Sequence, residues 1–84
     1  MRTYTFVNDP GHAWLKVPLK LALQVPGIST YSYVGKAHAY LEEDCDAGRY
    51  LRAMHPDKDY RIRETHTKGY ARIRNLPHFT YKGV

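Results

Sequence analysis

The chain has 84 residues, a length that supports one domain and one hydrophobic core. It carries 13 Lys and Arg against 8 Asp and Glu, and its single cysteine, Cys45, excludes an intramolecular disulfide and a four-thiolate zinc site. The N-terminal sequence lacks an apolar signal-peptide segment, and no stretch approaches the roughly 18 apolar residues of a membrane-spanning helix. We therefore expect a single domain over residues 1–84, located in the reducing cytoplasm, with no membrane partner.

The N-terminal part of the chain predicts a β-hairpin followed by a short helix. Residues 3–7 and 13–17 alternate between two faces, and the Asn-Asp-Pro-Gly sequence at 8–11 is typical of a turn. From Pro18 onward the apolar residues are three and four positions apart, which indicates a helix over residues 18–25. The Pro-Gly pair that follows ends this helix.

The middle of the chain predicts a second hairpin and a second helix. Residues 30–34 and 37–42 are strand-like, and Gly35-Lys36 between them suits the central positions of a type II′ turn. The spacing then changes to that of a helix with one apolar face, formed by Ala47, Tyr50, Leu51 and Met54. Pro56 ends this second helix.

The positive charge is concentrated in the last part of the chain. Residues 49–84 carry nine Lys and Arg against three Asp and Glu, whereas residues 1–48 carry four against five. Such an excess attracts polyanions and acidic protein surfaces. It also keeps a small domain soluble, which is the simpler interpretation.

Two segments in this basic part predict a third hairpin. Residues 60–63 and 70–74 alternate strictly, with an arginine at every second position of each segment. If Ile62 and Ile73 face the core, the pleat places their sequence neighbours on the outer face. The residues of that face are Arg61, Arg63, Tyr70, Arg72 and Arg74. Arginine pairs with phosphate and carboxylate groups and tyrosine stacks on bases, so we interpret this face as a binding surface. A solvated basic strand that deters aggregation would carry the same pattern.

The predicted elements follow the order β-β-α-β-β-α-β-β. We expect an α+β domain in which an antiparallel sheet built from hairpins carries both short helices on one face. Residues 76–84 are interrupted by proline and glycine and are predicted to form a coil tail, with Phe79 and Tyr81 packing back on the domain.

Four carboxylates lie together between the second hairpin and the second helix: Glu42, Glu43, Asp44 and Asp46. Asp44 and Asp46 resemble the start of a calcium loop, but Gly48 and His55 stand where that loop requires ligands. Asp44 or Asp46 can instead cap the helix, and acidic residues are stabilising at a helix N-terminus. We therefore predict a helix cap, with an acidic contact for a partner as the alternative interpretation.

The sequence contains no recognisable catalytic arrangement. The five histidines lack the spacing that places two metal ligands on one helical face, and Cys45 has no neighbouring base. Phosphate-binding glycine loops and serine-hydrolase motifs are missing too. The sequence thus predicts a protein that is not an enzyme and has neither a metal site nor a cofactor.

The sequences GHAWLKV at 11–17, YSY at 31–33 and YLEEDCDA at 40–47 stand out, the last being the most specific. Together they resemble a family of short uncharacterised proteins encoded by phages and other mobile elements. The likeness covers roughly residues 3–75. It implies a phage-type setting, in which small non-catalytic proteins commonly act by binding a host or phage macromolecule. It implies no particular fold, activity or site residue.

Two functions follow from these observations. The first is a phage-type accessory protein that binds stoichiometrically to a host or phage protein complex, for example to inhibit a defence or nucleic-acid-processing system. Separate acidic and basic segments favour such docking to charge-complementary partners. The alternative is a module that binds nucleic acid directly through the arginine-rich hairpin face, which would give strongly salt-dependent binding.

Overall fold

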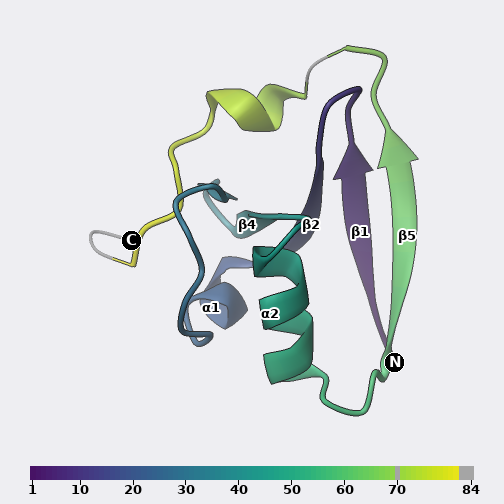
Figure 1. Cartoon of the computed structure of the whole chain (residues 1–84), viewed down its shortest axis with the longest axis vertical. Coiled ribbons are helices and arrows are strands. Elements are labelled where there is room, and N and C mark those ends of the chain that lie inside the picture. The colour runs from purple at the N-terminus through teal and green to yellow at the C-terminus, as the bar shows by residue number, and fades with distance from the viewer. Residues whose placement is uncertain (70, 82–84) are drawn as a thin grey trace.

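The computed structural model describes residues 1–69 and 71–81, which form a five-stranded sheet with short helices (Figure 1). The strands are β1 Arg2–Asn8, β2 Ala13–Pro18, β3 Tyr33–Val34, β4 His38–Glu42 and β5 Tyr60–His66. The helices are α1 Leu19–Ala22, α2 Asp46–Met54 and the 3-10 helix η1 Arg72–Asn75. The strand order is β3-β4-β2-β1-β5, so β3 and β5 form the two edges. The predicted α+β class is confirmed.

The first hairpin is confirmed. β1 and β2 pair antiparallel, with Phe6 opposite Leu15. The turn between them is held by Asp9, whose Oδ1 accepts hydrogen bonds from the backbone N–H groups of Gly11 and His12, both at 2.9 Å. This side-chain-to-backbone bonding explains why the chain reverses at the Asp-Pro-Gly sequence.

The second hairpin also forms, but its turn lies one residue later than expected. The N–H of Gly35 donates to the carbonyl of His38 at 2.8 Å, so Lys36 and Ala37 occupy the turn in place of Gly35 and Lys36. β4 pairs along its whole length with β2, and this longer contact sets where the turn falls. The register moves by an even number of residues, so the same side chains of β4 still face the core.

Both predicted helices form. α1 is shorter than expected and buries Ala22. α2 begins at Asp46 and presents the predicted apolar face, with Ala47 and Tyr50 buried and with Leu51 and Met54 half-buried. Its end at Met54 agrees with the stop expected from the proline two residues later.

The predicted third hairpin is wrong. β5 pairs in parallel with β1, with Tyr4 opposite Ile62 and Thr5 opposite Arg63. Residues 72–75 form η1 where a final strand was expected. The sheet is therefore mixed, and its antiparallel hairpins account only for β1 to β4. Tyr70, assigned to this hairpin, lies outside the described residues.

Packing on the two faces of the sheet explains this difference. On the helix-covered face, the ring centroid of Tyr60 lies 6.4 Å from that of Tyr4, so β1 gives β5 an aromatic neighbour. On the opposite face, Ala71 and Ile73 are buried against Trp14, which directs η1 away from β5. Alternation indicates which side chains of a strand share a face, but it does not determine which strand it pairs with.

The two faces of the sheet are covered differently (Figure 1). The main core lies between the sheet and the helices α1 and α2, and it buries Leu15, Leu41 and Tyr50 completely. Both helices therefore lie on one face, as predicted. The other face carries a smaller cluster, in which η1 covers Trp14. Among the described residues, no helix is long and apolar enough to cross a membrane.

The segment after η1 runs along the β3 edge. The N–H of Val34 donates to the carbonyl of Pro77 at 2.9 Å, and Phe79 is fully buried in the main core. Tyr81 hydrogen-bonds through its hydroxyl to the loop after α1. The predicted coil over residues 76–84 is thus irregular in its described part, and the packing of Phe79 in the core is confirmed. Tyr81 is 43% exposed and is held by its hydroxyl. Residues 82–84 lie outside the described part of the chain.

Candidate functional site

The two arginines of β5 lie on the sheet face opposite α1 and α2. Arg63 is opposite Thr5, Thr5 is opposite Lys16, and Lys16 is opposite Tyr40, so a row of side chains crosses four strands. Arg61 lies next to this row, and both arginines are exposed. We call Lys16, Arg61 and Arg63 the basic face. The sequence analysis missed Lys16 and Tyr40, although strict alternation within β2 and β4 already placed both away from the core.

β5 has a free outer side, because none of the described residues pairs with it there. Its residues are exposed, except for the half-buried Tyr60. In a parallel pair, successive residues direct their backbone groups alternately toward and away from the partner strand. The N–H of Thr67 donates to the carbonyl of Asn8, the last residue of β1, at 2.8 Å. By alternation, the backbone N–H and C=O groups of Ile62 and Glu64 point to the free side.

Arg72 and Arg74 belong to η1 and do not continue the strand face of Arg61 and Arg63. Arg74 is engaged within the protein: its Nε donates to Oδ2 of Asp9 at 2.7 Å, and its Nη2 donates to Oδ1 at 3.0 Å. The Asp9 side chain is fully enclosed, and the hydrogen bond from Arg74 holds the pKa of Asp9 far below its ordinary value. Arg74 therefore anchors η1 to the first turn.

Of the four acids predicted as a helix cap, Glu42 is the one that caps α2. Its carboxylate accepts backbone hydrogen bonds from Asp44 at 2.8 Å, from Cys45 at 2.7 Å and from Asp46 at 2.8 Å. Desolvation raises the pKa of Glu42, but these three donors outweigh it, and the pKa lies below its ordinary value. The sequence analysis favoured Asp44 or Asp46 for this role. Glu42 takes it because it ends β4 and reaches the N–H groups of Cys45 and Asp46 at the start of the helix, together with that of Asp44 in the preceding turn.

Asp46 points into the protein instead and is only 1% exposed. Its Oδ2 accepts hydrogen bonds from the hydroxyls of Ser29 and Ser32, both at 2.6 Å, and from the backbone N–H of Ser29 at 3.1 Å. These bonds tie the loop after α1 to the first turn of α2. Glu43 and Asp44 are exposed, so these two acids are available for the predicted acidic contact.

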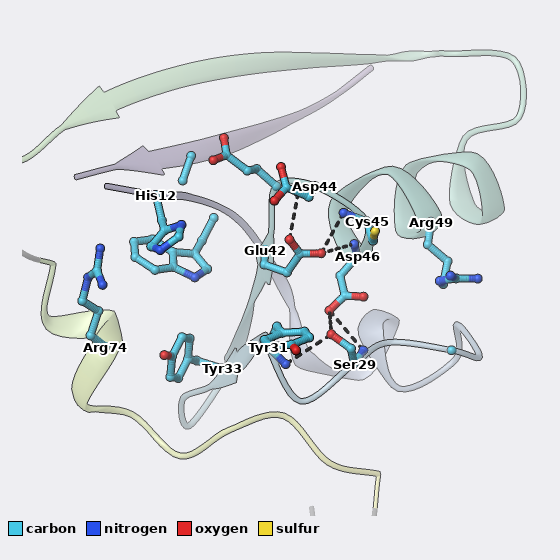
Figure 2. Close-up of a pocket in the computed structure, with 14 residues that line it drawn as sticks. His12, Ser29, Tyr31, Tyr33, Glu42, Asp44, Cys45, Asp46, Arg49 and Arg74 are labelled. Carbon is cyan, nitrogen blue, oxygen red and sulfur yellow. Dashed lines mark hydrogen bonds between the residues drawn. The ribbon is translucent and has the colours of Figure 1, made fainter. Parts of the chain in front are cut away.

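A hollow of about 540 Å³ lies beside this acidic turn (Figure 2). Trp14, Tyr31 and Tyr33 contribute aromatic rings to its wall, and Glu42 and Asp44 contribute carboxylates. The ring centroids of Trp14 and Tyr33 are 6.2 Å apart with the planes at 72°, an edge-to-face contact that fixes both rings. The sequence analysis missed this hollow, because its wall comes from segments that only the fold brings together.

A chain of four hydrogen-bonded side chains connects β1, α2 and the turn after α2. Nδ1 of His55 lies 3.0 Å from Oδ1 of Asp59, and Nε2 of His55 lies 2.6 Å from the hydroxyl oxygen of Tyr4. The Tyr4 hydroxyl in turn lies 3.0 Å from the hydroxyl of Tyr50. An aspartate, a histidine and a hydroxyl in series are the groups of nucleophilic catalysis, but Tyr4 is only 3% exposed. We therefore interpret the chain as a link between β1 and α2.

The pKa shifts within this chain agree with a structural role. Burial raises the pKa of the Tyr50 hydroxyl, so it stays protonated and available for hydrogen bonding throughout the neutral range. The hydrogen bond with His55 lowers the pKa of Asp59. Both groups are thus held in the protonation states in which they hydrogen-bond to their neighbours, which suits a link between β1 and α2.

The described part of the chain contains no group of three His, Cys, Asp or Glu side chains that could hold a metal ion. Comparisons with protein-family models, with curated proteins and with solved structures find no match for this chain. The resemblance to phage-type proteins therefore stays a prediction. The surfaces that bear on function are the β5 edge, the basic face and the hollow.

Proposed function

We propose that this chain is a non-catalytic, phage-type accessory protein that binds another protein stoichiometrically, by adding one strand of that protein to β5. The supporting observation is the free outer side of β5, to which the backbone groups of Ile62 and Glu64 point. A strand that docks there gains main-chain hydrogen bonds, which supply affinity in strand addition. The proposed partner is a host or phage protein complex in the cytoplasm of the host cell.

The side chains of β5 indicate the chemistry of the docking strand. Arg61 and Arg63 project from the same face, and Lys16 lies on that face on β2. Residues directly opposite each other on neighbouring strands share a face, and opposite charges at such positions are stabilising. The proposed partner strand therefore carries Asp or Glu at alternate positions, where they face the two arginines.

A second copy of this chain is a poor partner for the same edge. Antiparallel pairing of two β5 strands about Ile62 would place Arg61 opposite Arg63 on both sides of the centre. Pairing about Arg63 would place that residue opposite itself. Like charges directly opposite each other are destabilising, so the arginines oppose self-pairing while they attract an acidic strand.

The substitution Glu64→Pro tests strand addition. Proline removes an outward N–H, and its ring obstructs an approaching strand. The pairing with β1 is retained, because the N–H of residue 64 points away from β1 and proline is tolerated at such edge positions. Glu64→Ala is the matched control, since it changes the same side chain and keeps the N–H.

Two measurements use these variants. A synthetic strand peptide with alternating Glu is titrated into each protein, and proteins are captured on each variant from nuclease-treated host lysate. We expect Glu64→Pro to weaken peptide binding at least about tenfold, which corresponds to about 1.4 kcal/mol, and to lose the captured proteins that Glu64→Ala retains. If Glu64→Pro is folded by circular dichroism and binds like the parent, strand addition is excluded.

Direct binding of single-stranded nucleic acid is a second candidate, favoured by the row of Tyr40, Lys16 and Arg63 on the sheet face opposite α1 and α2. Basic side chains next to an aromatic ring neutralise phosphates and stack on bases. This candidate predicts oligonucleotide binding that weakens steeply with salt and survives Glu64→Pro, because phosphate contacts release counterions and need no strand edge. Lys16→Gln with Arg63→Gln should reduce the salt dependence.

A further inference from the structure

We propose that the hollow beside the N-terminus of α2 is a binding site for a small organic cation, an alkylated ammonium or guanidinium group. Its volume of about 540 Å³ falls within the roughly 300–1,000 Å³ typical of small-molecule sites. The described residues that line it come from β2 and the turn before it, from β3 and the loop before it, from the end of β4, from α2 and the turn before it, and from η1. β5 contributes none of them. The site is therefore independent of strand addition.

The aromatic wall is the first reason to expect a cation. Trp14, Tyr31 and Tyr33 all line the hollow, and aromatic ring faces attract cations within about 6 Å of their centroids. Trp14 is only 3% exposed and already contacts Arg74, whose guanidinium carbon lies 5.4 Å from its centroid, so the rings open to a ligand are those of Tyr31 and Tyr33. Tyr31 is 77% exposed, so most of its ring surface is accessible to a ligand.

The charges around the hollow favour a cation over an anion. Glu42 is ionised at neutral pH, and the exposed Asp44 adds a carboxylate at the rim of the hollow (Figure 2). Glu43, which is also exposed, lines the hollow as well. Two arginines also line the hollow, but Arg74 is already paired with a carboxylate. Arg49 is therefore outnumbered by the carboxylates of Glu42, Glu43 and Asp44, which leaves the hollow with a negative net charge. A positively charged ligand complements that charge.

The arrangement of the acids favours an organic cation over a metal ion. Glu42 already accepts three backbone hydrogen bonds, and the carboxylate of Asp46 is turned inward toward two serines. Within the described residues, no three potential ligands converge on one point. A metal ion needs several converging oxygens, whereas an alkylated cation needs ring faces and an acidic rim.

Trp14 provides the readout, because it is the single tryptophan of the chain and lines the hollow. Choline is titrated while the tryptophan fluorescence is followed, and 3,3-dimethylbutan-1-ol serves as the neutral analogue of the same shape. We expect a saturable change with choline and at least about tenfold weaker binding of the neutral analogue, since ring faces and carboxylates both favour the charge. Equal binding of the two compounds, or no saturable change with either, would overturn the proposal.

Variants at the rim identify the residues responsible. Tyr31→Ala and Asp44→Asn should each weaken choline binding at least about threefold, and both positions are exposed, so the fold is retained. Asp57→Asn is the control, because it removes an exposed acid that does not line the hollow. Unchanged affinity in both Tyr31→Ala and Asp44→Asn would contradict the assigned site.

Further ligands distinguish the possible sources of the cation. Nα-acetylarginine amide carries a guanidinium on a peptide-like frame. Tighter binding of this compound than of choline would identify a basic side chain of a partner protein as the occupant, and tighter binding of choline would identify a free ammonium compound. Glu64→Pro should bind choline like the parent, so failure of strand addition and failure of this site give different results.

Discussion

The two edges of the sheet are protected in different ways. β3 is short, and residues 77–79 lie beside it, with a hydrogen bond from Val34 to the carbonyl of Pro77 and with Phe79 buried in the core. β5 has seven residues, and among the described residues nothing covers its outer side. In the described part of the chain, that edge is protected chiefly by the charged side chains of Arg61 and Arg63. The covered edge therefore contributes to stability, whereas the open edge is available to a partner.

Removing the anchor of the covered edge should have a large effect on stability. Phe79→Ala deletes a fully buried ring and is expected to lower the free energy of unfolding by about 3–5 kcal/mol. The matched change on the open edge is Ile62→Ala, where the side chain is 38% exposed and the expected loss is within about 1 kcal/mol. Denaturant unfolding of both variants measures the difference. Similar losses would show that β5 is as important to the fold as the C-terminal segment.

Acid should loosen residues 71–79, which lead to the covered β3 edge, before it loosens the open β5 edge. The folded pKa of Asp9 lies below the ordinary value of 3.8, because the carboxylate is bonded to Arg74 and to backbone N–H groups. Its stabilising contribution is therefore complete above that value, and it is lost as the pH falls below it toward the folded pKa. Hydrogen exchange from pH 5 downward should show residues 71–79 losing protection before β1 and β5.

Asp9→Asn should reproduce this loosening at neutral pH. We expect amide exchange over residues 71–79 to accelerate at least about tenfold, because Arg74 and the N–H of Ala71 lose their charged acceptor. Asp57→Asn, at an exposed acid, serves as the control. Equal exchange in Asp9→Asn and parent would show that η1 is held by apolar contacts alone.

Reversing one charge on the open edge should produce a modest self-association. When two β5 strands pair about Ile62, residue 61 of each copy lies opposite Arg63 of the other. Arg61→Glu therefore replaces two pairs of like charge by two pairs of opposite charge, each worth about 0.2–1 kcal/mol. We expect a concentration-dependent dimer by analytical ultracentrifugation, weakened by salt. Arg61→Gln removes repulsion without adding attraction and should associate less. A monomeric Arg61→Glu protein would mean that something other than charge keeps two copies apart.

The parts of the fold that depend on local chemistry could be predicted from the sequence. The turn at Asp9 and the apolar face of α2 follow from residues within a few positions of each other. The partner of β5 could not be predicted, because the alternation over residues 60–63 fits any neighbouring strand. Pairing with β1 depends on packing between residues far apart, such as Tyr60 on Tyr4.

The candidate sites likewise include features that depend on local sequence and features that only the folded chain creates. The outward position of Arg61 and Arg63 was predicted and is seen, since it needs only the pleat. The hollow could not be predicted, because Trp14, Tyr31 and Asp44 approach each other only in the folded chain. Glu42 was included among the acids, but its position as the cap depends on where β4 ends.

The parallel pairing of β1 with β5 also bears on how the protein is made. Arg2 pairs with Tyr60 and Asn8 with His66, so residues 9–59 separate the two strands in the chain. Closing such a long loop costs entropy before any contact offsets it, and pairings of this kind form slowly. During synthesis the segment from β1 to α2 leaves the ribosome before β5 and is able to collapse without it. We expect β5 to join after β1 to β4, so that the proposed docking edge exists only once the rest of the sheet is assembled.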